Sequence, residues 1–256
     1  KYHIYKMKNK ILKKVLGTLG YKLIDKKLFK NERLISNKSY LTMDRLLKNL
    51  FEEKKINNLI QIGANDGSRF DIINKYIKSY KVKSLLVEPI KESFEKLKEN
   101  YKGFNFVTFE NSAISVNNEL MYLYKVDPKY FGNYDDHIPG ITSFDKKHLL
   151  NHGVKKKHIV KEKINSLTLE NLINKHNIND FEILYIDVEG YDGNIVNDFL
   201  NNIIIRPIII LEYIHINNDV FQKLINNLQK NKYEFFAIDE NLVCFPEKYI
   251  KYIKFN

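Results

Sequence analysis

The sequence contains a single cysteine and lacks long apolar runs. Cys244 stands alone among 256 residues, so an internal disulfide and a cysteine-rich metal site are both excluded. No apolar stretch reaches the length of a membrane-spanning helix, and internal repeats, low-complexity linkers and a secretory signal are missing. Since the chain starts at Lys1 rather than at methionine, an earlier segment is expected to be absent. We therefore expect one soluble domain in a reducing cytoplasm.

Basic residues are concentrated in the first 40 residues. This arm holds twelve Lys and Arg residues against Asp25 and Glu32, whereas the whole chain has a net charge of +11. Five apolar side chains of the arm follow helical spacing: Ile11, Leu12, Val15, Leu16 and Leu19. Such a basic amphipathic helix either packs on the domain or on a second subunit of a homodimer, or lies peripherally on the anionic inner face of a membrane. No base-reading motif accompanies the charge, so nucleic acid is not an expected partner.

From about residue 40 onward, apolar residues alternate between helical and strand spacing. Helices are expected around 43–51, 69–79, 94–97, 166–176, 193–202 and 220–228. Strands are expected at 59–63, 84–88, 104–109, 181–187 and 207–213, with a final antiparallel hairpin formed by 235–238 and 242–245 at the sheet edge. This alternation predicts an α/β fold, an open and mostly parallel sheet with an antiparallel last strand.

The apolar run 59–62 breaks into a glycine turn, Gly63 to Gly67, and Glu88 ends the next predicted strand 21 residues later. A glycine turn and a strand-end carboxylate suit a nucleoside-containing ligand. Only two glycines enclose the turn, so a ligand without a pyrophosphate, such as S-adenosylmethionine, fits better than a dinucleotide. A short-chain dehydrogenase would also need a tyrosine four residues before a lysine, and only Tyr2 and Lys6 in the basic arm have that spacing.

These residues make up the predicted cofactor site. The glycine turn should lie under the methionyl and ribose parts, where Asn65 or Asp66 would bond the ammonium group. The Glu88 carboxylate has two acceptor oxygens and would take both ribose hydroxyls, unless it is an ordinary solvated carboxylate at a strand end. The predicted set is Gly63, Ala64, Asn65, Asp66, Gly67, Glu88 and Pro89.

Six short motifs together resemble the FkbM family of S-adenosylmethionine-dependent O-methyltransferases. They are IGANDG at 62–67, VEP at 87–89, NSAIS at 111–115, ITSF at 141–144, SLTLENLI at 166–173 and IDVEGYD at 186–192. The resemblance implies a class I methyltransferase (Rossmann-like) fold over residues 41–256, with Ser112 and Ala113 beside the adenine. It also implies methyl transfer to a hydroxyl of a sugar, such as a nucleotide sugar or a capsule-type surface glycan of a bacterium. The alternatives are a lipid or polyketide hydroxyl, or a membrane-associated scaffold with a degenerate cofactor site.

Four titratable residues follow two neighbouring predicted strands and are the candidates for the methyl-transfer chemistry. Asp187 and Glu189 would share one face if their strand persists, and Glu212 and His215 end the next strand. Asp187 or His215 would act as the general base, while Glu189 and Glu212 would orient the acceptor or hold a cation. The structural alternative is that the acidic cluster caps helices, particularly through Asp192.

A metal ion is optional in this interpretation. No helical ligand pair and no dense acidic loop stands out in the sequence, and if a divalent cation is present we expect Asp187 and Glu212 to hold it.

The segment 126–153 is too long and too mixed in composition for a simple connection. It carries glycines, prolines, aromatic residues and histidines, including Tyr130, Tyr134 and His137. Long loops inside a compact domain are usually functional, so we expect it to contact the acceptor. His137 is an alternative general base, or simply an exposed loop histidine.

Overall fold

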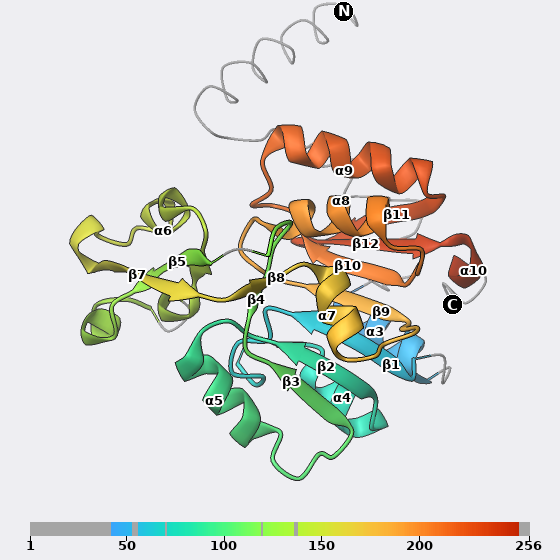
Figure 1. Ribbon diagram of the computed structural model, residues 1–256, viewed down its shortest axis with the longest axis horizontal. Helices are drawn as coiled ribbons and strands as arrows, with labels where there is room; N and C mark the ends of the chain where they lie inside the picture. Colours follow the sequence, from blue (N-terminus) through green and yellow to red (C-terminus); the bar gives the residue numbers. More distant parts are fainter. Residues whose placement is uncertain (1–41, 53–55, 70, 119, 136–137, 251–256) are drawn as a thin grey trace, which may run out of the picture. The chain divides into compact units, whose positions relative to one another are not determined.

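The computed structural model describes residues 42–52, 56–69, 71–118, 120–135 and 138–250 (Figure 1). The basic arm predicted for residues 1–40 lies outside the described residues. The same holds for His137, the alternative base.

A seven-stranded sheet in the order β3-β2-β1-β9-β10-β12-β11 forms the centre of the fold (Figure 1). Its strands are β1 (Asn58–Ile62), β2 (Lys83–Val87), β3 (Val107–Glu110), β9 (Ile183–Ile186), β10 (Ile208–Glu212), β11 (Tyr233–Ile238) and β12 (Asn241–Pro246). Neighbouring strands are parallel in the part β3-β2-β1-β9-β10 of the sheet, and β12 runs antiparallel to both β10 and β11. The mostly parallel sheet and the antiparallel last strand are confirmed, although β12 lies between β10 and the edge strand β11.

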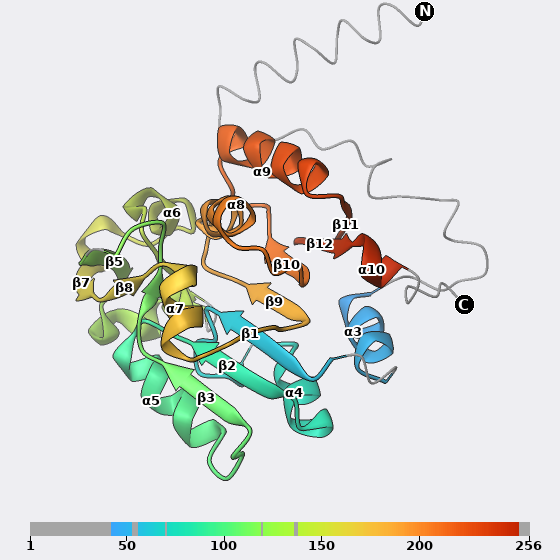
Figure 2. The same ribbon diagram turned by 45° about the vertical axis from the view of Figure 1, so that its right-hand side comes forward.

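Helices cover both faces of this sheet (Figure 2). One face packs on α3 (Met43–Glu52), α4 (Asn74–Tyr80) and α5 (Lys91–Asn100), and the other on α7 (Leu169–Lys175), α8 (Asp192–Asn202) and α9 (Asn218–Lys230). Because side chains alternate along a strand, Leu59 of β1 joins the first core while Ile60 and Ile62 join the second. A short helix, α10 (Glu247–Ile250), follows β12. None of the described helices combines the length and the apolar character that a membrane crossing requires.

Residues 121–164, here called the insert, form a small folded unit rather than a loop. Its elements are β5 (Met121–Val126), η2 (Pro128–Asn133), η3 (Ile138–Gly140), β6 (Thr142–Ser143), α6 (Lys146–Asn151), η4 (Lys156–His158) and β7 (Ile159–Ile164). The strands pair in the order β6-β5-β7. The insert has an apolar core of its own, made by Val126, Ile138, Ile141, Leu149, Val154 and Ile159. The prediction of a long loop over 126–153 is therefore wrong. The sequence does not reveal these elements because their apolar residues are scattered too widely to show a helical or strand period.

The two ends of the insert are joined by a second small sheet. Before the insert, β4 (Ala113–Ile114) pairs in parallel with β8 (Ser166–Leu167), which follows it. The Ser115 hydroxyl also donates a hydrogen bond to the Ser166 hydroxyl at 3.2 Å. The insert thus enters and leaves the domain at neighbouring points, next to the edge of the central sheet where β1, β2, β9 and β10 end.

Candidate active site

The glycine turn after β1 is fixed by close backbone packing. The N–H groups of Gly63 and Ala64 both donate to the Val87 carbonyl at 3.0 Å. Gly63 has a φ of +84°, and a Cβ placed on it would lie 1.8 Å from the carbonyl oxygen of Asp187. Gly67, with a φ of +67°, leaves no room for a Cβ beside Leu97. Glycine is therefore required at Gly63 by the neighbouring backbone, and at Gly67 it is favoured by the positive φ and by the Leu97 and Tyr101 side chains.

Glu88 is buried and held from two sides. Only 5% of the residue is exposed, and its two carboxylate oxygens accept the N–H groups of Asn65 at 2.9 Å and Ile90 at 2.8 Å. Burial raises the pKa of Glu88 to about 7, and the two N–H groups counteract that rise in part. The carboxylate is thus fixed against the glycine turn, with its second lone pairs left for a ligand.

A cavity of about 1200 Å³ opens where β1, β2, β9 and β10 end, and the insert supplies another part of its wall. Twelve of the thirteen predicted site residues line it: Gly63, Ala64, Asn65, Asp66, Glu88, Pro89, Ser112, Ala113, Asp187, Glu189, Glu212 and His215. Gly67 is not among the lining residues and serves the turn instead, donating its N–H to the Ala64 carbonyl. Asp66 also supports the turn, because one of its oxygens accepts the N–H groups of Ser68 and Arg69.

Asp187 and Glu212 face the cavity as buried acids. Burial, followed by the nearby Glu189 carboxylate, raises the pKa of Asp187 to about 7. Burial, followed by the charge of Asp187, raises the pKa of Glu212 to about 9. Glu212 Oε2 is buried and has no hydrogen-bond partner within the described part of the chain. Both shifts favour the protonated form, more strongly for Glu212, which as a neutral acid can donate a hydrogen bond.

Glu189 does not share a strand face with Asp187, because β9 ends at Ile186. The condition for that prediction, a strand that persists through Glu189, is not met: Glu189 has a φ of +54°, in the left-handed region. The buried Asp192, the first residue of α8, holds this turn by accepting the N–H group of Gly190 at 3.2 Å. No side chain that the structure describes caps the start of α8, so the helix-capping alternative is wrong for Asp192. The turn directs the Glu189 carboxylate toward His148, whose Nε2 lies 2.8 Å from Glu189 Oε2.

His215 follows β10 and lies beside two other histidines. Burial lowers the pKa of His215 to about 4, and the neighbouring His148 adds to that effect. Its ring is therefore neutral at physiological pH. Its Nε2 lies 3.8 Å from Glu212 Oε1.

Several residues of the site were not predicted from the sequence. Asp71 lies in the cavity wall, bonded by Gln61 at 3.1 Å, and burial raises its pKa. Glu240, in the tight turn between β11 and β12, also lines the cavity. Neither has a motif around it. The pair His148 and His152 did carry a signal, because the two residues are four apart, as on one helix face; the statement that no helical ligand pair stands out is wrong.

The insert gives the cavity an aromatic side. Phe131, Tyr134 and Phe144 line it together with His152. The rings of Phe144 and Tyr191 meet edge to face at a centroid distance of 4.9 Å, which links the insert to the loop after β9.

The sheet order, the single antiparallel strand and a cavity at the carboxyl ends of the parallel strands define a class I methyltransferase fold. The model of the family described as methyltransferase FkbM domain matches residues 61–235, and the chain belongs to this family. It is therefore a methyltransferase, and the family resemblance seen in the motifs is confirmed.

Solved structures with a similar chain path have low sequence identity. Methyltransferase FkbM from Methylobacillus flagellatus KT is 12% identical with a TM-score of 0.45, over 74% of this chain but only 44% of that chain. Precorrin-6y C5,15-methyltransferase from Geobacter metallireducens GS-15 is 10% identical with a TM-score of 0.40, over 85% of this chain and 96% of the other. An SAH-bound methyltransferase of Podospora anserina is 8% identical with a TM-score of 0.41, over 85% and 81%. No curated protein matches the chain.

Proposed function

We propose that this methyltransferase transfers the methyl group of S-adenosylmethionine to a hydroxyl of a sugar, such as a nucleotide sugar or a surface glycan. The observation that carries the proposal is the buried Glu88 carboxylate, clamped by backbone N–H groups against the glycine turn in the wall of a large cavity. This arrangement offers two fixed acceptor oxygens, as a ribose diol requires.

The described residues fit the cofactor in charge as well as in shape. Bound S-adenosylmethionine supplies an electrophilic methyl group on a positively charged sulfur. Asp71, Asp187 and Glu240 line the cavity, and a bound cation would favour the ionised form of Asp71 and Asp187, which burial disfavours. Ser112 is only 2% exposed, and its hydroxyl has no partner in the part of the chain that the structure describes, so it can meet a ligand near the adenine end.

The chemistry assigned to the protein is proton removal and orientation. Asp187 takes the proton of the acceptor hydroxyl as that oxygen forms its bond to the methyl carbon and the carbon–sulfur bond breaks. A pKa near 7 suits this role at neutral pH. Glu212, with a pKa of about 9, donates a hydrogen bond that orients the acceptor.

A sugar acceptor is supported by the wall that the insert contributes. Phe131, Tyr134 and Phe144 of the insert line the cavity and give this part of its wall an aromatic character. Carbohydrate rings pack their C–H faces on aromatic side chains and bond their hydroxyls to polar groups nearby.

Calorimetric titration with S-adenosylhomocysteine, followed by mass spectrometry of methyl transfer to a panel of acceptors, tests this function. The panel contains nucleotide sugars, free glycans and hydroxylated lipids. A mass gain of one methylene on a sugar supports the proposal. A gain on the lipid alone selects the lipid alternative, and absent S-adenosylhomocysteine binding in a folded protein contradicts the cofactor assignment.

Glu88→Gln is expected to weaken S-adenosylhomocysteine binding by about 1.5–3 kcal/mol, a tenfold to hundredfold rise in Kd, because a charged acceptor of the ribose is lost. Glu182→Gln is a matched control, since Glu182 also accepts two backbone N–H groups, those of Asn57 and Asn58 at the start of β1. Calorimetry should show normal affinity for the control. Equal affinities for both variants and the wild type would remove Glu88 from the site.

The pH dependence of binding provides an independent check on the same residue. The ionised form of Glu88 accepts both ribose hydroxyls, so wild-type affinity should rise as the pH passes through about 7. The difference between the wild-type and Glu88→Gln profiles isolates this residue from Asp187, which titrates in the same range.

The basic arm is proposed to serve location or assembly rather than chemistry. Deletion of residues 1–38 should leave turnover on a soluble acceptor within about twofold, while binding to anionic vesicles falls or a dimer dissociates. Vesicle sedimentation and light scattering distinguish these two effects. A folded truncated protein without turnover would show that the arm contributes to the active site.

A further inference from the structure

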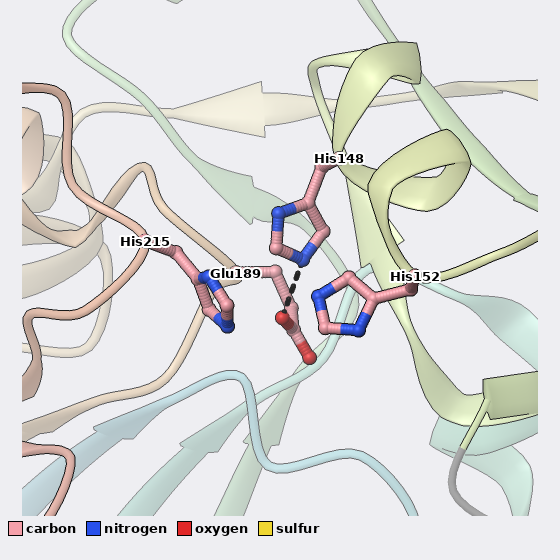
Figure 3. Close-up of side chains that lie close together, drawn as sticks. All are labelled: His148, His152, Glu189 and His215. Atoms are coloured by element: carbon pink, nitrogen blue, oxygen red, sulfur yellow. Dashed lines mark hydrogen bonds and ion pairs between the residues drawn. The ribbon is translucent and has the colours of Figure 1, made fainter. Parts of the chain in front are cut away.

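Three histidines and a glutamate from three separate segments meet beside the cavity. His148 and His152 come from α6 and its end, Glu189 from the loop after β9, and His215 from the loop after β10. One ligand atom from each lies within 4.8 Å of the others. Figure 3 shows the three imidazole rings grouped around the Glu189 carboxylate.

The helical spacing of the two insert histidines prepares the arrangement. The His152 N–H donates to the His148 carbonyl at 3.2 Å, so the helical turn continues to His152 and both rings point to one side. Their ring centroids are 4.6 Å apart, and those of His148 and His215 are also 4.6 Å apart. A third pair, His152 and His215, is separated by 5.2 Å.

The loops that carry Glu189 and His215 approach each other closely. Gly190 has a φ of +99°, and a Cβ there would lie 3.0 Å from the His215 carbonyl oxygen. Glu189 adopts a left-handed conformation, uncommon for a residue with a side chain, and its carbonyl accepts the Ser143 hydroxyl at 3.2 Å. Backbone strain at a cluster of potential ligands points to a requirement for that side-chain position.

We propose that His148, His152, Glu189 and His215 bind one divalent transition-metal cation of the Zn²⁺ class. Imidazole nitrogens with one carboxylate suit Zn²⁺, Co²⁺ or Fe²⁺, whereas Mg²⁺ and Ca²⁺ prefer oxygen ligands throughout. A tetrahedral site with metal–ligand distances of about 2.0–2.1 Å needs its ligand atoms roughly 3.4 Å apart. Since the present separations are at most 4.8 Å, side-chain rotation with little backbone movement is enough to close the site.

The site differs from the metal position expected from the sequence. Asp187 and Glu212 are not members of this group of four. The cation would join α6 of the insert to the two loops that follow β9 and β10. His152, Glu189 and His215 also line the cavity, so an acceptor hydroxyl could replace the carboxylate as the fourth ligand and be acidified. This last role rests on the proposed function.

Cobalt and zinc binding to the full chain tests the site directly. After removal of metals with a chelator, equilibrium dialysis against Zn²⁺ should give one equivalent per chain. Co²⁺ should give the intense visible absorption of a four-coordinate ion, and Mg²⁺ at the same concentration should not compete. X-ray absorption at the zinc edge of the wild type should show imidazole scattering, a result that depends on no variant.

Single variants locate the bound ion. His148→Gln, His152→Gln and His215→Gln should each weaken Co²⁺ binding at least tenfold. His176→Gln is the matched control, because His176 pairs with Glu110 at 2.9 Å elsewhere in the fold, and Asp187→Asn tests the alternative position. Both should bind Co²⁺ normally.

The outcomes separate this proposal from the proposed function. A wild type that binds S-adenosylhomocysteine but no Co²⁺ or Zn²⁺ overturns the metal site and leaves the cofactor assignment intact. Undiminished binding in all three folded histidine variants, or zinc-edge spectra without imidazole, overturns it as well.

Discussion

Asp187→Asn should lower kcat by about a hundredfold or more while the affinity for S-adenosylhomocysteine changes little. The amide keeps the size of the side chain but cannot accept the acceptor's proton, and removing a general base typically costs this much. Initial rates on one sugar acceptor, together with calorimetry, measure the two quantities separately. Normal turnover in this variant would mean that the base lies elsewhere, and His137, the alternative base named from the sequence, would be tested next.

Protein stability distinguishes a chemical effect from misfolding. Burial raises the pKa of Asp187 to about 7, so between its unfolded value and pH 7 the folded state holds a proton that the unfolded state releases. Stability therefore falls as the pH rises through this window, and at pH 8 the amide variant should be at least as stable as the wild type. Asp198→Asn, on α8 and bonded to Asn202, is a control that should affect neither rate nor binding.

Glu212→Gln is expected to lower turnover by a smaller factor than Asp187→Asn, because the role of Glu212 is to orient the acceptor by a hydrogen bond. Because burial holds Glu212 as a neutral acid, the amide should retain some ability to donate a hydrogen bond. A smaller loss than for Asp187→Asn would thus assign proton transfer to Asp187 and orientation to Glu212.

Among the glycines that the structure describes, Gly63 should tolerate replacement by alanine least. The added Cβ would meet the Asp187 carbonyl oxygen at 1.8 Å, so β1 and β9 must separate at the cavity. We expect a loss of roughly 3 kcal/mol or more in the free energy of unfolding, with S-adenosylhomocysteine binding abolished. Urea unfolding and calorimetry measure both effects.

Gly103→Ala separates steric crowding from backbone strain. Gly103 has a φ of +88°, close to that of Gly63, but a Cβ there would meet nothing within 4 Å. The free energy of unfolding of this control should fall by only about 1–2 kcal/mol, because alanine is strained in the left-handed conformation, and its cofactor binding should be normal. A similar loss of unfolding free energy in both variants would show that the structure around the Asp187 carbonyl moves at little cost to make room for the Cβ.

The sequence was sufficient for the central sheet because local patterns and long-range structure agree there. Buried strands such as β9 and β10 are short apolar runs, and the glycine turn follows β1 directly. The predicted ends of helices were less accurate where a side-chain hydrogen bond determines the residue at which the helix begins. The helix expected at 69–79 begins at Asn74, since Asp71 accepts the N–H groups of Ile73 and Asn74 and so turns the preceding chain.

The insert and the histidine cluster could not be assembled from the sequence. The strand β6 has two residues, Thr142 and Ser143, which is too short for a period to show. The cluster depends on the position of α6 against two loops from distant parts of the chain, and on the left-handed turn at Glu189, which redirects a carboxylate that strand alternation would have placed otherwise. Asp71 and Glu240 reach the cavity only through tertiary packing.

The pairing of β4 with β8 has an evolutionary consequence. Since it brings together the points where the insert leaves and rejoins the domain, the whole unit between them can be lengthened, shortened or exchanged without altering the strand order of the central sheet. Glu88 and the glycine turn lie before this junction in the chain, and β9 and β10 lie after it. Residues 121–164 can thus change in evolution to suit a new acceptor, while the part of the cavity formed by the glycine turn and Glu88 stays the same.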